Sequence, residues 1–260
     1  MKIGIFDSGV GGLTVLNESL EIMPYEDYIY IADSFNVPYG IKSKKMVKSF
    51  IFNIVGNLEN MGIDALLIAC NTATSIGVNE LREKYDFPIV GMEPAVKYAL
   101  EKNKEDRILV LATPLTLKED KYNDLVKKHD YRSRVDSLAL PELVDYAESY
   151  TFDNNIIIKY LSTKFRDYNM SEYSSIVLGC THFIYYKDHI KKLIGEEIKI
   201  LDGNRGTVKH LNNLINSKIK SYKQIKEIGK IELYKTTKNG IVKADFSKYM
   251  NLLGADRIEK

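Results

Sequence analysis

Cys70 and Cys180 are the only two cysteines of this 260-residue sequence, and their surroundings match. Each ends a short apolar run, 65–69 or 175–179, whose last residue is small. Polar residues suited to a helix start follow each thiol, beginning with Asn71 and Thr181. The amides and dipole of such a helix stabilise a thiolate, which lowers its pKa from about 8.5. We therefore predict that the two thiols are a reactive pair.

Several kinds of chemistry could use two thiols. Free cysteines are commonly buried and inert, and composition alone favours that interpretation. Redox-active cysteines usually lie close together in the sequence as Cys-x-x-Cys, which these two do not. A structural disulfide is typical of exported proteins, and the sequence shows no export signal. Cys180 and His182 form at most half of a metal site, so we predict no metal. The matched contexts instead favour proton transfer at a carbon, because inverting a stereocentre requires one group on each face.

The segment from Asp7 to Thr14 reads Asp-Ser-Gly-Val-Gly-Gly-Leu-Thr and follows an apolar strand. Its three glycines permit a tight turn and a close approach to a ligand. It is neither Gly-x-Gly-x-x-Gly nor a Lys-terminated phosphate loop, so it does not predict a nucleotide site. Asp7 and Ser8 are placed to hold an ammonium or a carboxylate, or to orient a thiol. Asp7 suits an ordinary helix N-cap equally well.

Apolar runs alternate with helix-length segments along the chain, which predicts an α/β fold with mainly parallel sheets. The expected strands are residues 3–6, 28–32, 65–69, 89–90, 107–112, 133–137, 176–179 and 197–201. The expected helices are residues 44–61, 74–84, 94–101, 117–128, 142–150 and 155–168. The matched thiol segments indicate two similar α/β domains: 1–96 with 206–260, which carries Cys70, and 97–205, which carries Cys180. The active site is expected in the cleft between them.

The formal charge of +2 is too small to indicate a nucleic-acid or membrane partner. No apolar run approaches the roughly 18 residues that a membrane helix needs. The N-terminus lacks the basic and apolar regions of an export signal, so a cytoplasmic location is expected. The Lys-rich stretch 213–235 is predicted to be a solvated helix and strand face.

Four blocks together resemble the signature blocks of glutamate racemase, in the aspartate/glutamate racemase superfamily. They are Asp-Ser-Gly-Val-Gly-Gly-Leu-Thr at 7–14, Val-Pro-Tyr-Gly at 37–40, Ala-Cys-Asn-Thr-Ala at 69–73 and Leu-Gly-Cys-Thr-His-Phe at 178–183. Weaker matches, including 91–95, 112–118, 201–203 and 246–254, extend the likeness over essentially the whole chain. Pro141, Val144 and Glu148 resemble a further block that supplies an acid beside the second thiol.

The resemblance implies racemisation of glutamate without pyridoxal or any other cofactor, which supplies D-glutamate for peptidoglycan. It implies that Cys70 takes the α-proton from D-glutamate and Cys180 from L-glutamate. The implied catalytic residues are Asp7, Cys70, Glu148, Cys180 and His182. The implied substrate-binding residues are Asp7, Ser8, Pro38, Tyr39, Gly40, Asn71, Thr72, Thr113, Thr116, Thr181 and His182. Family members are commonly homodimers, so a homodimer is expected.

Three segments depart from the family pattern. Residues 32–36 read Ala-Asp-Ser-Phe-Asn where Gly-Asp-Thr-Ala-Arg is usual, and residues 183–186 read Phe-Ile-Tyr-Tyr where Tyr-Pro-Leu-Leu is more frequent. Asp145 and Tyr146 stand where Pro and Leu are commoner. The alternatives are an aspartate racemase, a hydantoin racemase or maleate isomerase, and a non-catalytic amino-acid-binding regulator.

Overall fold

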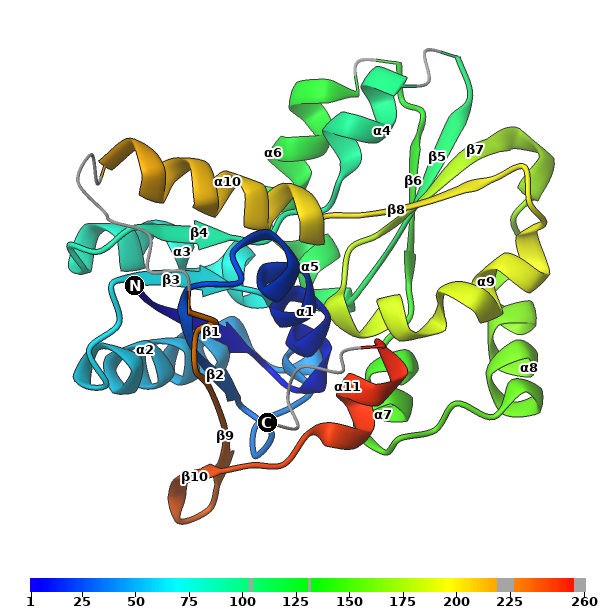
Figure 1. Cartoon of the computed structure of the whole chain (residues 1–260). Coiled ribbons are helices and arrows are strands. Elements are labelled where there is room, and N and C mark those ends of the chain that lie inside the picture. Colours follow the sequence, from blue (N-terminus) through cyan, green and yellow to red (C-terminus); the bar gives the residue numbers. More distant parts are fainter. Residues whose placement is uncertain (103–104, 131, 219–226, 255–260) are drawn as a thin grey trace.

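The computed structural model describes residues 1–102, 105–130, 132–218 and 227–254, and its strands form two separate sheets (Figure 1). The six-stranded sheet has the order β10-β9-β2-β1-β3-β4, and all its neighbours are parallel except β9 and β10. The four-stranded sheet has the order β6-β5-β7-β8 and is wholly parallel. We call each sheet with its helices the first lobe and the second lobe. The predicted α/β class with mainly parallel sheets is confirmed.

The strands of the first lobe are β1 (Lys2–Asp7), β2 (Asp27–Ala32), β3 (Ala65–Ile68), β4 (Ile89–Gly91), β9 (Ile231–Thr237) and β10 (Gly240–Lys243). Those of the second lobe are β5 (Arg107–Ala112), β6 (Val135–Ala139), β7 (Tyr173–Leu178) and β8 (Lys199–Asp202). Every residue of β3 is buried because helices cover both faces of the sheet. This double cover explains why the strand reads as an unbroken apolar run.

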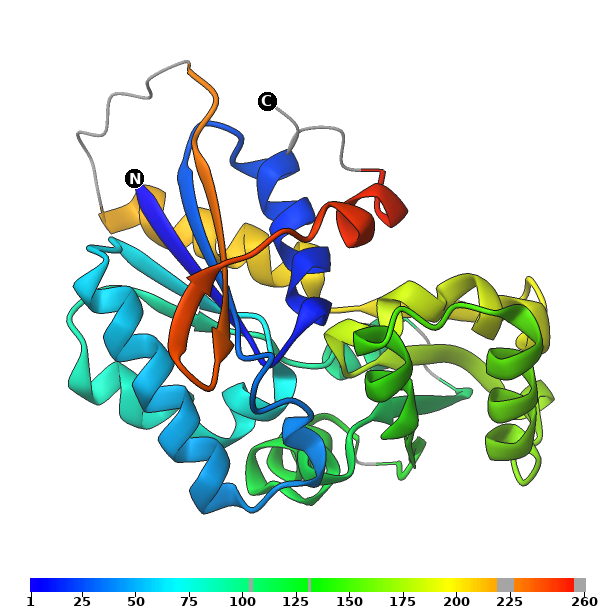
Figure 2. The same ribbon diagram turned by 90° about the horizontal axis from the view of Figure 1, so that it is seen from below.

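The helices are α1 (Leu13–Ile22), α2 (Lys44–Asn60), α3 (Asn71–Lys84), α4 (Val96–Lys102), α5 (Pro114–Lys118), α6 (Asp120–His129), α7 (Glu142–Glu148), α8 (Asn154–Phe165), α9 (Lys187–Ile194), α10 (Asn204–Lys218) and α11 (Ser247–Leu252). Short 3-10 turns are η1 (Val10–Gly12), η2 (Tyr39–Ile41), η3 (Met170–Glu172) and η4 (Thr181–Tyr186). In the first lobe, α1 and α10 pack together on one face of the sheet, and α2 and α3 pack together on the other (Figure 2).

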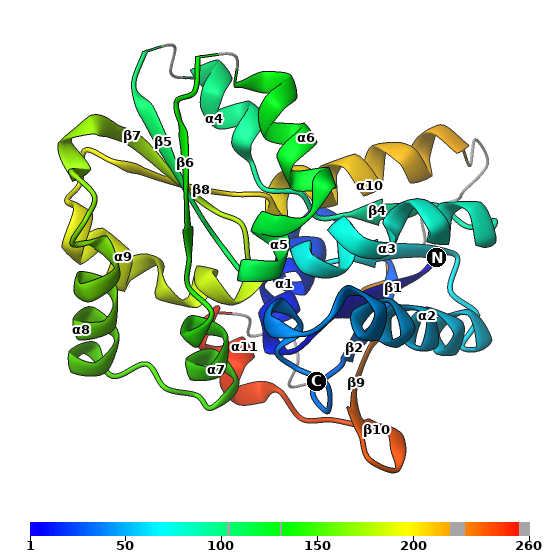
Figure 3. The same cartoon turned by 180° about the vertical axis from the view of Figure 1, so that it is seen from behind.

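The chain enters the second lobe after β4 and returns to the first lobe after β8 (Figure 3). After this return α10 packs against α1, and β9 pairs with β2. Helix α11 also reaches the second lobe, where the Tyr249 hydroxyl donates to the carbonyls of Ala147 and Glu148, both at 3.0 Å. The domain boundaries given above stay a prediction, and part of the Lys-rich stretch lies outside the described residues.

One predicted helix, 117–128, is confirmed from 120 onward and is interrupted near its start. The structure ends α5 at Lys118 and begins α6 at Asp120, with Glu119 in an extended conformation between them. The Glu119 carbonyl accepts from the amides of Tyr122 and Asn123 at the start of α6, and its carboxylate lies 2.6 Å from the ammonium of Lys44. The strand expected at 133–137 begins at Val135, after Ser133 adopts a positive φ of 52°.

Within the described residues, no helix is long and apolar enough to cross a membrane. In the same residues, no three His, Cys, Asp or Glu side chains gather closely enough to hold a metal ion.

Candidate active site

The two thiols lie at the carboxyl edges of the two sheets, and both line one small cavity. Cys70 follows β3 and Cys180 follows β7, one in each lobe. Both side chains are buried, with exposed fractions of 6% and 8%. The cavity is nearly closed, with a volume of about 10 Å³. Its lining consists of Ser8, Tyr39, Gly40, Cys70, Asn71, Thr72, Thr113, Val144, Cys180, Thr181 and His182.

Cys70 is held by the N-terminus of a helix and by one hydroxyl. It is the N-cap of α3, and its Sγ accepts from the backbone amide of Ala73 at 3.4 Å. The Sγ of Cys70 also lies 3.6 Å from the Ser8 hydroxyl. Burial nevertheless raises the pKa of Cys70 to about 12, and the nearby charge of Asp7 adds to that rise. The prediction of a lowered pKa at Cys70 is wrong, because desolvation outweighs the helix amide.

Cys180 does not begin an α-helix. The 3-10 turn η4 follows it, and the thiol makes no cap bond to that turn. The predicted helix-dipole stabilisation is therefore wrong for this thiol. Its partner is a side chain instead, since the Sγ of Cys180 lies 3.8 Å from Nδ1 of His182. The imidazole supplies the polar contact that an α-helix supplies at Cys70.

Glu148 contacts the ring nitrogen of His182 that does not face Cys180. The Nε2 of His182 and the Oε1 of Glu148 are 2.7 Å apart. Burial lowers the pKa of His182, but its contacts with Cys180 and Glu148 outweigh burial and hold that pKa well above 6.5. An imidazolium at neutral pH can therefore donate to Glu148 through one nitrogen and to the Cys180 sulfur through the other.

The glycine-rich turn brings the first lobe against these groups. The amide of Val10 donates to Oε1 of Glu148 at 2.7 Å. A Cβ at Gly9 would lie 1.8 Å from the same oxygen, and one at Gly11 would lie 2.5 Å from Nδ1 of His182. Glycine is required at both positions because the second lobe leaves no room for a side chain. The glycine-rich turn was predicted to approach a ligand closely; in the structure it closely approaches side chains of the second lobe.

Asp7 is fully buried beside this turn. Its Oδ2 accepts from the Gly12 amide at 2.8 Å, and the Thr181 hydroxyl lies 3.4 Å from both carboxylate oxygens. Burial raises the pKa of Asp7 from 3.8 to about 6, although the nearby His182 acts in the opposite direction. Asp7 does not line the cavity itself, and its closest contact with the second lobe is Thr181.

Polar residues at the starts of α3 and α5 lie on another side of the cavity. The hydroxyls of Thr72, Thr113 and Thr116 are each 2.9 Å from the other two, so they join the two helices. The side-chain oxygen of Asn71 is buried and has no hydrogen-bond partner in the described part of the chain. An unpaired buried acceptor is costly, and a donor on a bound ligand would satisfy it.

The predicted residues 38–40 are only partly at the cavity. Tyr39 and Gly40 line it, whereas Pro38, which follows a cis peptide bond, does not. The Tyr39 hydroxyl donates to the buried carboxylate of Asp33. Thr116 also lies outside the lining and contacts it through Thr72 and Thr113.

Sequence reasoning missed three residues around the site. Val144 lines the cavity, and its place in the block that contains Glu148 was the available signal. The Tyr30 hydroxyl donates to the carbonyl of Gly9, and the Tyr185 hydroxyl donates to the carbonyl of Val10 at 3.0 Å. Nothing distinguished these two among eighteen tyrosines.

The chain matches the model of the Asp/Glu/hydantoin racemases over residues 14–211. It is 57% identical to glutamate racemase from Halothermothrix orenii over 215 residues, which are 83% of this chain and 85% of the relative. It belongs to the Asp/Glu/hydantoin racemase family. The resemblance to glutamate racemase seen in its sequence blocks is confirmed.

Two crystal structures of racemases superpose on almost all of this family member. Glutamate racemase from Francisella tularensis in complex with D-glutamate has a TM-score of 0.81 at 25% identity, covering 97% of this chain and 93% of the other. Glutamate racemase from Escherichia coli, in complex with L-glutamate and an activator, has a TM-score of 0.80 at 26% identity, covering 91% and 89%.

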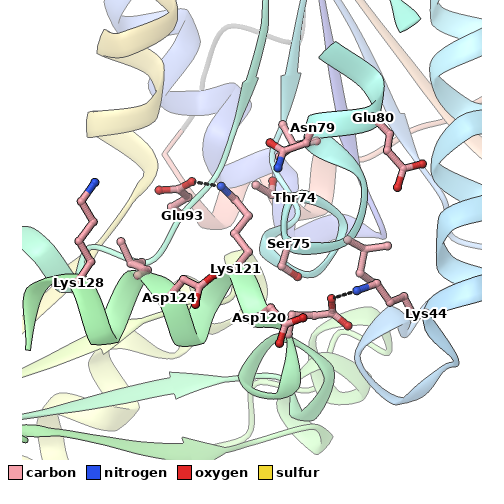
Figure 4. A pocket seen from close by; sticks show the side chains of 14 residues that line it. Lys44, Thr74, Ser75, Asn79, Glu80, Glu93, Asp120, Lys121, Asp124 and Lys128 are labelled. Carbon is pink, nitrogen blue, oxygen red and sulfur yellow. Dashed lines mark hydrogen bonds and ion pairs between the residues drawn. The ribbon is translucent and has the colours of Figure 1, made fainter. Parts of the chain in front are cut away.

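A wider groove of this racemase lies apart from the thiols, between α3 and α6 (Figure 4). Its volume is about 470 Å³, and it carries charged side chains of both signs. Lys121 pairs with Glu93 at 2.5 Å, and Lys44 pairs with Glu119 at 2.6 Å. Neither cysteine lines this groove. Because both thiols line the smaller cavity, we take that cavity as the candidate active site, although the groove has the greater volume.

Proposed function

We propose that this racemase interconverts L-glutamate and D-glutamate, with Cys70 and Cys180 as the paired acid and base. The observation that carries the proposal is that two thiols from different lobes line one buried cavity. Inverting a carbon centre requires a proton donor and a proton acceptor that face it from two sides. The complexes of the two solved relatives with D-glutamate and L-glutamate support glutamate as the substrate.

The main barrier is the weak acidity of the α-proton. Negative charge that develops toward the substrate carboxylate must be stabilised by preorganised hydrogen-bond donors. The hydroxyls of Ser8, Thr72 and Thr181 and the amide of Asn71 are suitable donors at the cavity. Their burial strengthens each of these interactions because little water competes with them.

The ionisation of Cys70 depends on the substrate in this proposal. With its pKa raised to about 12 by burial, Cys70 rests as a thiol. The α-ammonium of glutamate brings a positive charge into the cavity, which favours a thiolate. The partnerless oxygen of Asn71 is a suitable acceptor for that ammonium.

The ionisation of Cys180 depends on a protein group. The imidazolium of His182, paired with Glu148, offers a positive charge and a donor to the Cys180 sulfur. We assign Cys180 to the α-proton of L-glutamate and Cys70 to that of D-glutamate. After one thiolate removes the proton, the opposite thiol delivers its own proton to the other face of the carbon. After the two proton transfers, the thiol and the thiolate have therefore exchanged places.

Further parts of the proposal rest on the family. They are a homodimer, a cytoplasmic location, a supply of D-glutamate for peptidoglycan, and domains at 1–96 with 206–260 and at 97–205. Pro38, Tyr39, Gly40, Thr113 and Thr116 complete the proposed substrate-binding set, with Pro38 and Thr116 acting from behind the lining.

Polarimetry of L-glutamate with the purified protein and no added cofactor tests the function. We expect the optical rotation to fall to zero as the two enantiomers equilibrate. A constant rotation with glutamate and a decay with aspartate would replace the proposal by aspartate racemisation. A constant rotation with both, together with binding of either amino acid in calorimetry, would indicate a non-catalytic regulator.

A further inference from the structure

The backbone of Val10 is held by the second lobe at both of its polar groups, the amide and the carbonyl. Its amide donates to Oε1 of Glu148 at 2.7 Å, and its carbonyl accepts from the Tyr185 hydroxyl at 3.0 Å. The same carbonyl also accepts from the amide of Leu13 within the turn. Glu148 and Tyr185 come from different elements, α7 and η4, so two segments of the second lobe hold the backbone of one residue of the first lobe.

The position of the Val10 backbone affects the surroundings of Cys180. Oε1 of Glu148 has two partners, the Val10 amide and Nε2 of His182. His182 in turn contacts the sulfur of Cys180 through its other ring nitrogen. A displacement of Val10 would therefore release Glu148 on one side and change how firmly it holds the imidazole.

Tyr185 is well placed to hold the backbone of Val10 rigidly. It lies on η4, the same short turn that begins just after Cys180 and includes Thr181 and His182. Its ring lies against the ring of Phe152 at 5.8 Å between centroids and against that of Tyr249 at 6.0 Å. Aromatic packing of this kind fixes the ring, and with it the direction of the hydroxyl. Tyr185 does not line the cavity.

We propose that Tyr185 is a positioning residue, which ties the glycine-rich turn to the turn of Cys180 and so keeps Glu148 and His182 aligned for proton transfer at that thiol. The effect is confined to one face of the substrate. Cys70 depends on Ala73 and Ser8, and neither of them contacts Tyr185 through a hydrogen bond recorded for the described residues. The inference rests on the proposed racemase function.

Tyr185→Phe is the test, because it removes one oxygen and keeps the packed ring. The matched control is Tyr186→Phe, whose hydroxyl donates to the Thr151 carbonyl at 3.1 Å, away from Val10. Exchange of the α-proton would be measured in deuterated water, separately for L-glutamate and D-glutamate. We expect Tyr185→Phe to slow exchange from L-glutamate about 5-fold, which corresponds to about 1 kcal/mol for one hydrogen bond, and exchange from D-glutamate by less than about 2-fold.

Tyr186→Phe should leave both exchange rates unchanged. Equal slowing from both enantiomers in Tyr185→Phe, or no slowing at all, would overturn the positioning role. A wild-type protein that exchanges neither enantiomer would instead overturn the proposed function. Should Tyr185→Phe unfold at the assay temperature, amide exchange of Val10 would be followed by NMR at a lower temperature. Faster exchange in this variant than in Tyr186→Phe supports the proposal, and equal rates contradict it.

Discussion

The two thiol settings have the same place in their sheets and different chemical neighbours. Cys70 and Cys180 each follow a central strand of a parallel sheet, at the carboxyl edge. The first is contacted by a helix amide and the Ser8 hydroxyl, and the second by an imidazole that a carboxylate holds. Repeated α/β geometry therefore places two thiols in equivalent positions without giving them equivalent means of ionisation. Exchange of the α-proton from L-glutamate and from D-glutamate should consequently respond differently to substitution.

Removing either thiol should have the largest effect. We expect Cys70→Ala and Cys180→Ala each to lower the rate of racemisation by more than about 10³-fold, since inversion needs both groups. Circular dichroism should show the wild-type fold in both variants. The more informative pair is Cys70→Ser and Cys180→Ser, assayed for α-proton exchange in deuterated water. Loss of exchange from D-glutamate in the first and from L-glutamate in the second would confirm the assignment, and the reverse pattern would exchange the two roles.

Asp7 stands between the two settings and should affect both directions. Asp7→Asn removes the negative charge beside the cavity, and we expect activity to fall about 100-fold with either enantiomer, the size of a lost charged hydrogen bond. Slower α-proton exchange from one enantiomer only would assign Asp7 to a single thiol.

The same Asp7→Asn variant should become more stable than the wild type as pH rises. The folded protein raises the pKa of Asp7 from 3.8 to about 6 through burial, so folded Asp7 binds a proton more tightly than unfolded Asp7. Stability from this group is therefore fully present below about pH 4 and is lost as pH rises through about 6. The difference between variant and wild type in the free energy of unfolding should grow by about 2 kcal/mol between pH 4 and 7. Urea unfolding at several pH values measures it, and a difference independent of pH would contradict the burial of a charged Asp7.

Glu148→Gln should act on the Cys180 side alone. Loss of the carboxylate removes one of the contacts that hold the pKa of His182 above 6.5, so the imidazole should become neutral at the assay pH. We expect exchange from L-glutamate to slow about 30-fold at pH 8 and to recover partly toward pH 6, where the imidazole is protonated again. The pH profile for D-glutamate exchange should keep its wild-type shape. Equal changes in both profiles would mean that Glu148 serves the whole site.

Ser8→Ala is the counterpart on the Cys70 side and should have a smaller effect than Glu148→Gln. The serine hydroxyl is 3.6 Å from the Cys70 sulfur, a weak contact that helps to stabilise a thiolate. We expect exchange from D-glutamate to slow about 10-fold, with exchange from L-glutamate changed by less than about 3-fold. Because Ser8 also lines the cavity, KM for both enantiomers should be measured with the rates. A change in KM alone would restrict Ser8 to binding.

The sequence predicted the class of fold and the pair of thiols because both depend on local patterns. Strand β3 is an unbroken apolar run, and the polar residues after Cys70 begin a helix as expected. The pKa of Cys70 could not be predicted, because desolvation depends on residues of the other lobe that close over the thiol. The 3-10 turn after Cys180 also escaped prediction, since its sequence suits a helix start and tertiary contacts such as Tyr185 with Val10 shape it.

The threonine contacts are a second case that local sequence patterns could not predict. Thr72, Thr113 and Thr116 were expected as substrate ligands, and each of them is recognisable only from its family block. In the folded chain their hydroxyls bond to one another across α3 and α5. Contacts between segments so far apart in sequence leave no periodic pattern. The extended Glu119 between α5 and α6 likewise interrupts a helix that the sequence predicted as continuous.

The return of the chain to the first lobe has a consequence for synthesis on the ribosome. All strands of the second lobe come from one uninterrupted stretch between Arg107 and Asp202, so its sheet can form as soon as that stretch has emerged. The first sheet must wait, because the edge of β2 is covered only when β9, near the end of the chain, is made. Until then, that edge offers free backbone groups to other chains. Nascent chains that end before Ile231 should therefore depend most on chaperones, although both thiol-bearing strands have already been synthesised.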